Sequence, residues 1–325
     1  MREMTRPLAA SGLVFLLAVA GGVRAQAPPP HGTQAPPRTQ DSAKSPAHPT
    51  PPDRPLPDPK AFLAQAMKHL RSNDLLRSQY TYQEKETRYS YDSAGRVTKT
   101  QLRVYEVHPS AEPELTYRRL VSENGVRPAD LAKRDANQRR KESDWLARRQ
   151  REGLNARDAR LRREAEEDRK EQAVVDELTS IYEFRMTGRE IVDGRAVIVF
   201  SLEPRSGYSP RTPQGRILKS FRGRAWVDEQ EYELVRLKTE VLETVGVRFS
   251  FIVRLLKGSR GHIERRKVDG VTWLPTYSRF TGSGRVFFVV RIDLDQVSEF
   301  FAYRRKDRAE AAQRPTGQPE AYPLE

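Results

Sequence analysis

The sequence has 325 residues, of which 37% are hydrophobic and 31% are charged, so it can form a core beneath a very polar surface. Its 58 Lys and Arg residues exceed its 44 Asp and Glu residues, which gives a formal net charge of +14. The absence of cysteine excludes a disulfide scaffold, a thiolate metal site and a cysteine nucleophile. The five histidines are scattered without metal-ligand spacing, so we expect no metal and no cofactor.

Residues 1–25 have the pattern of a secretory signal peptide. Arg2 and Arg6 precede an apolar run of about 16 residues, which is shorter than the roughly 20 needed to span a bilayer. Small or apolar residues stand at the positions that a signal peptidase probes, so we predict cleavage after Ala25. A retained membrane anchor is the alternative. The protein is therefore expected to be exported, to the periplasm or outside the cell.

Export changes what the positive charge implies. An exported basic protein meets anionic membrane surfaces or acidic envelope proteins rather than nucleic acid, so no nucleic-acid partner is expected.

Residues 26–59 contain 12 of the 23 prolines and show no apolar periodicity, which predicts a disordered linker. Residues 306–325 contain three more prolines and are predicted to form a disordered tail.

The folded body, predicted over residues 60–305, begins with a helix. Asp58-Pro59 provides a capping side chain and a proline at the first helical position. Phe62, Ala66 and Leu70 follow at four-residue spacing, which is typical of an amphipathic helix that ends near residues 72–73.

From Tyr80 onward the apolar period changes to two, which indicates strands. Turn residues such as Asp193-Gly194 and Asp269-Gly270 separate them, so most strands should be joined as hairpins of an antiparallel sheet of roughly 10 or 11 strands. The predicted strands are residues 80–89, 97–107, 115–122, 182–189, 196–202, 222–227, 232–242, 247–256, 261–268, 272–281 and 285–294.

Two of these strands, 247–256 and 285–294, carry a continuous apolar face that must be covered. Few helices are available for this: the helix at Phe62, part of a central insertion, and a short segment at residues 295–301. We therefore predict an α+β fold that is mostly β, in which an incomplete antiparallel barrel wraps around a few helices.

The central insertion, residues 127–177, breaks the strand pattern. Between residues 133 and 172 it holds 14 basic and 10 acidic residues, with i,i+4 pairs such as Arg160 and Glu164, so we predict a long charged helix. Leu154, Leu161 and Val175 share a heptad register, but Gly153 interrupts it, so the coiled-coil pattern is weak. Three interpretations stay open, of which a solvated helix is the simplest: the others are an arm that binds a partner or a membrane surface, and a nucleic-acid contact.

Motifs of catalysis are absent from the sequence, which contains no nucleophile elbow, phosphate-binding loop, dinucleotide fingerprint or H-E-x-x-H. Gly282-Ser283-Gly284 is predicted to be a hairpin tip. Glu84 and Glu86 share a strand face as an acid/base pair would, but an exposed sheet face is the simpler interpretation. Asp293 and Asp295 are interpreted as solvated strand-end charges, with a cation site as the alternative. We predict that the protein is not an enzyme.

Aromatic residues gather in the C-terminal half, where they form either ordinary core or the lining of a cavity for an apolar ligand. Residues 196–202 are apolar on both strand faces, which requires two apolar environments, one of which a ligand can supply. The candidate cavity residues are Trp226, Phe249, Phe251, Trp273, Phe280 and Phe288.

Three stretches carry a family resemblance: EIVDGRAVIVFSLEP at 190–204, FRGRAWVDEQEYELVRL at 221–237 and KVDGVTWLP at 267–275. Their order of strands and turns resembles the lipoprotein-carrier superfamily of exported bacterial proteins, which includes LolA-like and LolB-like carriers, RseB-like sensors and outer membrane lipoprotein-sorting relatives. The resemblance implies an incomplete barrel around helices and, in the carriers, an apolar cavity for acyl chains.

Together these observations predict an exported, non-enzymatic protein that holds a lipid acyl chain or a lipoprotein in an apolar cavity between sheet and helices. Its basic residues Arg222, Arg224, Arg248 and Arg254 would approach anionic head groups. The alternative function is a periplasmic sensor or protein-interaction module that uses the charged helical insertion.

Overall fold

The computed structural model describes residues 54–69, 78–92, 94–110, 112, 115–248, 252–286 and 290–306. The predicted leader, most of the predicted linker and all of the predicted tail except Lys306 lie outside the described residues. The helices are α2 (Pro59–His69), α4 (Leu131–Gln150), α5 (Leu154–Ile181) and α6 (Pro213–Leu218). The strands are β1 (Tyr80–Tyr91), β2 (Val97–His108), β3 (Tyr117–Glu123), β4 (Tyr182–Val192), β5 (Arg195–Pro204), β6 (Phe221–Asp228), β7 (Leu234–Val241), β8 (Val245–Arg248), β9 (Ile252–Leu255), β10 (Arg260–Val268), β11 (Thr272–Val286) and β12 (Val290–Arg305).

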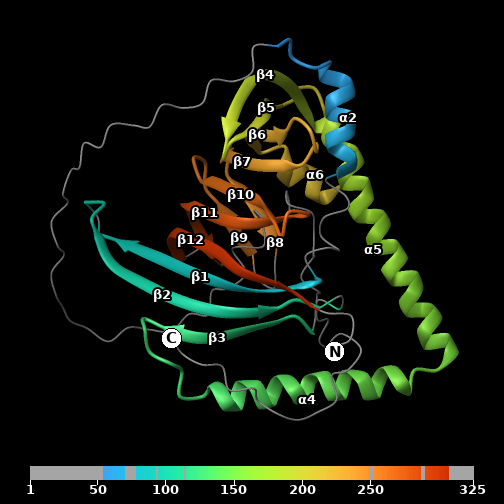
Figure 1. Ribbon diagram of the computed structural model, residues 1–325, viewed down its shortest axis with the longest axis vertical. Helices are drawn as coiled ribbons and strands as arrows, with labels where there is room; N and C mark the ends of the chain where they lie inside the picture. The colour runs from blue at the N-terminus through green and yellow to red at the C-terminus, as the bar shows by residue number, and fades with distance from the viewer. Residues whose placement is uncertain are drawn as a thin grey trace.

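All described strands belong to one antiparallel sheet, in the order β3-β2-β1-β12-β11-β10-β7-β6-β5-β4. The hairpin β8–β9 joins this sheet through β11. β3 and β4 stand at opposite ends of the order, so the sheet is open (Figure 1). The mostly β fold and the incomplete barrel predicted from the sequence are confirmed.

Local signals in the sequence explain where several elements begin. The backbone N–H of Ala61 donates to Asp58 Oδ1 at 2.7 Å, so the predicted cap starts α2. Asp193 and Gly194 have φ values of 49° and 77°, the left-handed pair that a two-residue type I′ turn requires between β4 and β5.

Two predicted strands differ in the structure. The apolar stretch predicted as one strand over 247–256 forms two short strands that pair with each other, with Val247 opposite Val253. An alternating pattern does not show where a chain reverses, and this stretch contains none of the usual turn dipeptides. Residues 295–301, predicted as a possible helix, belong to β12, where they pair with β1 and β11.

The predicted hairpin tip at Gly282-Ser283-Gly284 is wrong. β11 continues through these residues, and β11 and β12 are connected between Val286 and Val290, which pair. A Cβ atom on Gly282 would lie 2.5 Å from Ser259 Cβ. The glycine therefore allows a close approach inside a strand rather than a turn.

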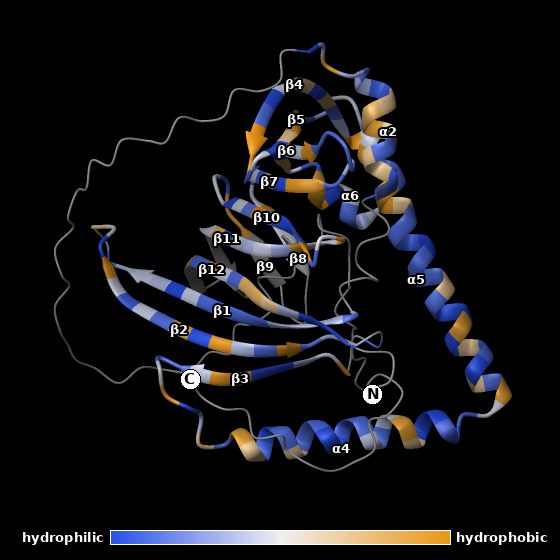
Figure 2. Cartoon of the chain, viewed as in Figure 1, coloured by the Kyte–Doolittle hydropathy of each residue, from blue (hydrophilic) through white to orange (hydrophobic). Residues whose placement is uncertain are grey.

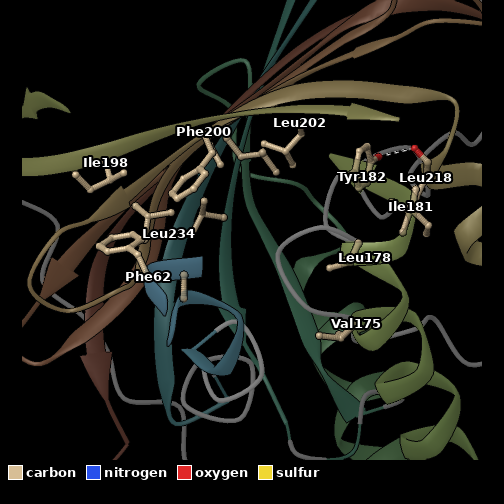
Figure 3. Packing of buried hydrophobic residues seen from close by; sticks show 14 of the residues in the cluster. Phe62, Val175, Leu178, Ile181, Tyr182, Ile198, Phe200, Leu202, Leu218 and Leu234 are labelled. Carbon is tan, nitrogen blue, oxygen red and sulfur yellow. Dashed lines mark hydrogen bonds between the residues drawn. The ribbon is translucent and has the colours of Figure 1, made fainter. Parts of the chain in front are cut away.

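Helices cover one face of the sheet, which we call the inner face (Figure 3). Alternate residues of β5 point to this face and pack against α2, α6 and the last turns of α5. The phenol of Tyr182 donates to the carbonyl of Leu218 at 2.5 Å and joins the start of β4 to α6. The buried members of this main core are Phe62, Ala66, Val174, Val175, Leu178, Ile181, Tyr182, Ile198, Phe200, Leu202, Leu218, Ala225, Val227, Leu234 and Leu237.

The charged insertion forms two helices rather than one. α4 ends at Gln150, and Gly153 precedes α5, so the interruption seen in the sequence is a bend (Figure 1). Val175 is buried in the main core, whereas Leu154 is 79% exposed and Leu161 46% exposed. The three residues of the weak heptad pattern therefore do not share one seam. No described helix is both long enough and apolar enough to cross a membrane.

The two parts of α5 should respond differently to the same truncation. Leu178 is buried against the sheet and Leu161 lies on the exposed part of the helix. We expect Leu178→Ala to lower the free energy of unfolding by about 2–5 kcal/mol because it leaves a cavity. Leu161→Ala, the matched control, should change it by less than about 0.5 kcal/mol. Urea unfolding measures both, and equal losses would contradict the described packing.

Candidate functional site

A second apolar cluster lies on the inner face beside the main core. Its buried members come from β6, β7, β9 and β11, and further members on α6, β8 and β12 are only partly buried. This inner-face cluster consists of Phe221, Val241, Leu255 and Phe280, with the partly buried Ile217, Val245 and Leu294. Apolar side chains that keep some exposure at the margin of a core are the surface on which an apolar ligand gains most.

The strand register shows that this cluster and the main core share a face. Phe280 pairs with Gly261, Gly261 with Thr239, Thr239 with Gly223, and Gly223 with Leu202. Directly paired residues of antiparallel strands point to the same side of the sheet. Between the two large side chains at the ends, the row is therefore built of small residues.

Thr239 is the unusual member of this row. A Cβ atom on Gly223 would lie 2.8 Å from the carbonyl oxygen of Lys238, so the backbone itself excludes a larger side chain beside Thr239. The hydroxyl Oγ1 of Thr239 is buried and has no hydrogen-bond partner in the part of the chain that the structure describes. An unsatisfied buried hydroxyl costs about 1–3 kcal/mol. This hydroxyl can therefore form a hydrogen bond with a bound molecule.

Beyond the cluster, the inner face becomes polar. Gln296 of β12 pairs with Phe280 on one side and with Arg88 of β1 on the other. Arg88 donates to the side-chain oxygen of Gln296 at 3.0 Å, and the Gln296 amide donates to Glu86 at 3.2 Å. Hydrogen-bonded strands are about 4.8 Å apart, so the change from aromatic to guanidinium takes place over about 10 Å.

The carboxylates Glu84 and Glu86 are buried, not exposed as the sequence pattern indicated. Their exposed fractions are 8% and 5%. Arg118 of β3 donates twice to Glu84, at 2.8 and 2.9 Å, and once to Glu86, at 2.8 Å. Its guanidinium also lies 3.5 Å from the ring centre of Tyr105. Alternation placed both carboxylates on one face, but the arginine that covers them comes from a distant part of the sequence.

This arrangement does not make an acid/base pair. Burial by itself would lower the pKa of Arg118, but the adjacent Glu84 and Glu86 carboxylates outweigh burial and raise it. The guanidinium therefore stays charged and is held by both carboxylates. The ionic group therefore separates the inner-face cluster from a further buried apolar cluster on the same face, which consists of Tyr82, Tyr105, Val107, Leu120 and Phe300.

Asp295 is also buried, at 2% exposure, which corrects the expectation of a solvated charge. Arg279 donates to it at 2.9 and 2.8 Å, and Tyr91 donates at 2.5 Å. The side chain of Asp293 lies outside the described residues. Among the side chains that the structure describes, no three His, Asp or Glu residues gather closely enough to hold a metal ion.

The predicted cavity residues are not all neighbours. Phe280 lies in the inner-face cluster, whereas Trp226 and Trp273 lie together on the opposite, outer face with Val197 and Val199 of β5. Phe249, Phe251 and Phe288 lie outside the described residues, so their place in a cavity stays a prediction.

Basic side chains cover the outer tryptophans. The Trp226 indole donates to Glu190 at 2.7 Å, and the guanidinium of Arg224 lies 5.1 Å from its ring centre. Arg222 ion-pairs with Glu240 at 2.9 Å on the same face. The second apolar environment of β5 is thus built from the protein's own side chains. Arg222 and Arg224 do not face the inner cluster, and the side chains of Arg248 and Arg254 are not described.

Sequence reasoning placed Leu294 on an apolar strand face but missed Thr239, Arg88 and Arg118 as members of this face. The signal for Thr239 was a polar residue between Leu237 and Val241 at strand spacing. The two arginines gave no such signal, because their neighbours are set by pairing between distant strands.

On the outer face, Glu231 should make stability depend on pH. Burial would raise its pKa, but Lys267, Trp273 and Arg195 outweigh burial and lower it from 4.5 to about 2. A carboxyl with a lowered native pKa contributes stability above its unfolded pKa and loses it as pH falls through the native value. We expect Glu231→Gln to destabilise the protein at pH 7, and the difference from wild type to shrink between about pH 5 and pH 2. Urea unfolding across this range checks this, and a constant difference would contradict it.

Thr239→Val tests whether the buried hydroxyl is unpaired. Valine has nearly the same shape and removes the hydroxyl, so we expect the ligand-free protein to become more stable, by up to about 1–2 kcal/mol. Thr276, another strand threonine whose buried hydroxyl lacks a described partner, provides a matched comparison in Thr276→Val. Thermal and urea unfolding measure both variants. A loss of stability in Thr239→Val would mean that the hydroxyl makes a hydrogen bond in the native protein.

No protein-family model matches the chain, and no curated protein matches it either. Solved structures that are similar include a LolA superfamily protein from Nitrosomonas europaea, with 11% identity, coverage of 76% of this chain and 93% of that chain, and a TM-score of 0.27. A putative outer membrane lipoprotein-sorting protein domain from Vibrio parahaemolyticus has 9% identity, coverage of 76% and 92%, and a TM-score of 0.29. The Pseudomonas aeruginosa MucA/MucB complex has 12% identity, coverage of 76% and 98%, and a TM-score of 0.21. The similar structures include groups that the sequence resemblance names, at identities too low to transfer a ligand or a partner.

Proposed function

We propose that this protein is an exported, non-enzymatic binding protein that holds the acyl chain of a lipid or lipoprotein against its inner face. The observation that carries the proposal is the inner-face cluster. Its members Ile217, Val245 and Leu294 are only partly buried although they lie directly beside a closed core. Covering such side chains with an acyl chain removes further apolar surface from water.

The polar residues beside the inner-face cluster support an amphiphile rather than a plain hydrocarbon. Gln296 and Arg88 follow Phe280 along one row across the strands. The Nε atom of Arg88 is buried without a hydrogen-bond partner among the described residues. An acyl chain on the cluster would bring its ester or head group toward this guanidinium.

Export and the lack of catalysis rest on the sequence. The apolar leader of residues 1–25 supports export, and the absent catalytic motifs support a binding role. If instead the protein were an interaction module working through α4 and α5, changes on the inner face would not affect its activity.

The test compares acyl-chain binding by two variants of β12, one changed on the inner face and one changed on the outer face. Leu294 and Val297 are both partly exposed residues of β12, and only Leu294 packs against the inner-face cluster. We expect Leu294→Gln to weaken binding of a fluorescent fatty-acyl probe about five- to tenfold, because it places an amide in the apolar contact. Val297→Gln should leave binding unchanged.

Organic extraction of the purified protein, followed by mass spectrometry, looks for a lipid that the protein already carries. The proposal fails if no lipid is recovered and no probe is taken up. It also fails if the two glutamine variants bind the probe equally well.

A further inference from the structure

The bend between α4 and α5 stands apart from the sheet. We call residues 145–163 the elbow; it lies at the lower right of Figure 1, where α4 leads into α5. Glu152 accepts from Arg149 at 3.4 Å and from Arg160 at 3.0 Å, so the end of α4 and the start of α5 are tied together. Arg149 also donates to Glu112 at 3.1 Å, which fastens the elbow to the loop before β3. These hydrogen bonds therefore fix the geometry of the elbow.

Charge is concentrated at the elbow. Residues 145–163 contain seven basic and two acidic residues, whereas residues 164–177 contain two basic and seven acidic residues. Five exposed arginines of the elbow make no ion pair with any described residue: Arg148, Arg151, Arg157, Arg162 and Arg163, of which Arg163 donates to the carbonyl of Ala159. These guanidinium groups stay available for a partner that carries negative charge.

Leucines accompany this charge. Leu146 is 49% exposed, Leu154 79% and Leu161 46%. Leu154 and Leu161 are seven residues apart on α5 and lie on one side of the helix together with Arg157. Figure 2 shows hydrophobic bands near the bend between α4 and α5, separated by hydrophilic stretches of both helices. A basic helical segment that also exposes large apolar side chains can attach to an anionic membrane surface.

We propose that the elbow docks onto the surface of an anionic lipid bilayer. The leucines enter the boundary between head groups and acyl chains, while the unpaired arginines bind lipid phosphates. Charge complementarity selects an anionic partner, and the three exposed leucines beside the arginines favour a bilayer, which offers phosphates and acyl chains together. The acidic part of α5, residues 164–177, is repelled by the same surface and keeps α5 from lying flat along it.

The proposal adds to the inner-face function a means of reaching lipid. The acyl-binding face belongs to the sheet, and the elbow lies at the far end of α5 from the main core. Docking through the elbow would hold the sheet near the membrane without inserting it.

Flotation of the full chain with lipid vesicles tests the elbow. The vesicles contain phosphatidylcholine with phosphatidylglycerol, and pure phosphatidylcholine is the neutral comparison. The elbow variant replaces Arg148, Arg151, Arg157 and Arg162 by glutamine. The control variant replaces Lys60, Lys68, Lys99 and Lys257, exposed lysines elsewhere on the protein, by glutamine and so removes the same charge. A third variant, Leu154→Ser, keeps the charge and removes apolar contact.

We expect wild type to bind anionic vesicles and to be released by salt, because screening weakens the contact with lipid phosphates. The elbow variant should bind at least about tenfold more weakly, Leu154→Ser more weakly than wild type, and the control nearly as wild type. Leu294→Gln should still bind vesicles, which separates docking from acyl-chain uptake.

Absence of binding to anionic vesicles would overturn the proposal, as would equal losses in the elbow and control variants. Sedimentation analysis tests the remaining alternative, which is that the elbow mediates self-association. If the elbow variant loses self-association and keeps vesicle binding, the elbow is a contact between two copies of the chain, and membrane docking is wrong.

Discussion

The architecture depends on one constraint: β5 carries large apolar side chains on both of its faces. Ile198 and Phe200 need cover on the inner face, and Val197 and Val199 need it on the outer face. Two different solutions meet this need. Helices α2, α6 and the end of α5 close the inner face, whereas tryptophans capped by arginine side chains close the outer one. Because the short α2 and α6 and only the last turns of α5 cover the inner face, the helical cover ends before the sheet does.

Because the helices leave part of the inner face uncovered, that part is the candidate site. Beyond Leu202, the row through Gly223, Thr239 and Gly261 has no side chain large enough to fill the face. The partly buried cluster around Phe280 lies next to it and leads to the ionic group of Arg118. An apolar surface beside a paired charge suits a ligand with both characters, and the same chain carries a basic, leucine-bearing elbow where such ligands would be met.

Much of this fold could be predicted from local patterns. The cap at Asp58 and the Asp193-Gly194 turn depend on neighbouring residues alone, and both are present as expected. The errors have a common cause. Whether Glu84 is exposed depends on Arg118, and whether Gly282 forms a turn depends on Ser259, each a contact between residues distant in the sequence. The same reason explains the cavity residues, because sequence clustering could not show that Trp226 and Phe280 lie on opposite faces.

The central claim is that an acyl chain lies on the inner face. Photocrosslinking with a fatty acid that carries a diazirine in its chain, followed by peptide mapping, tests it most directly. The account predicts labels on Ile217, Val245 and Leu294, with unlabelled fatty acid competing for the same positions. Labels confined to the outer tryptophans or to α4 and α5, or labels that excess fatty acid does not reduce, would contradict it.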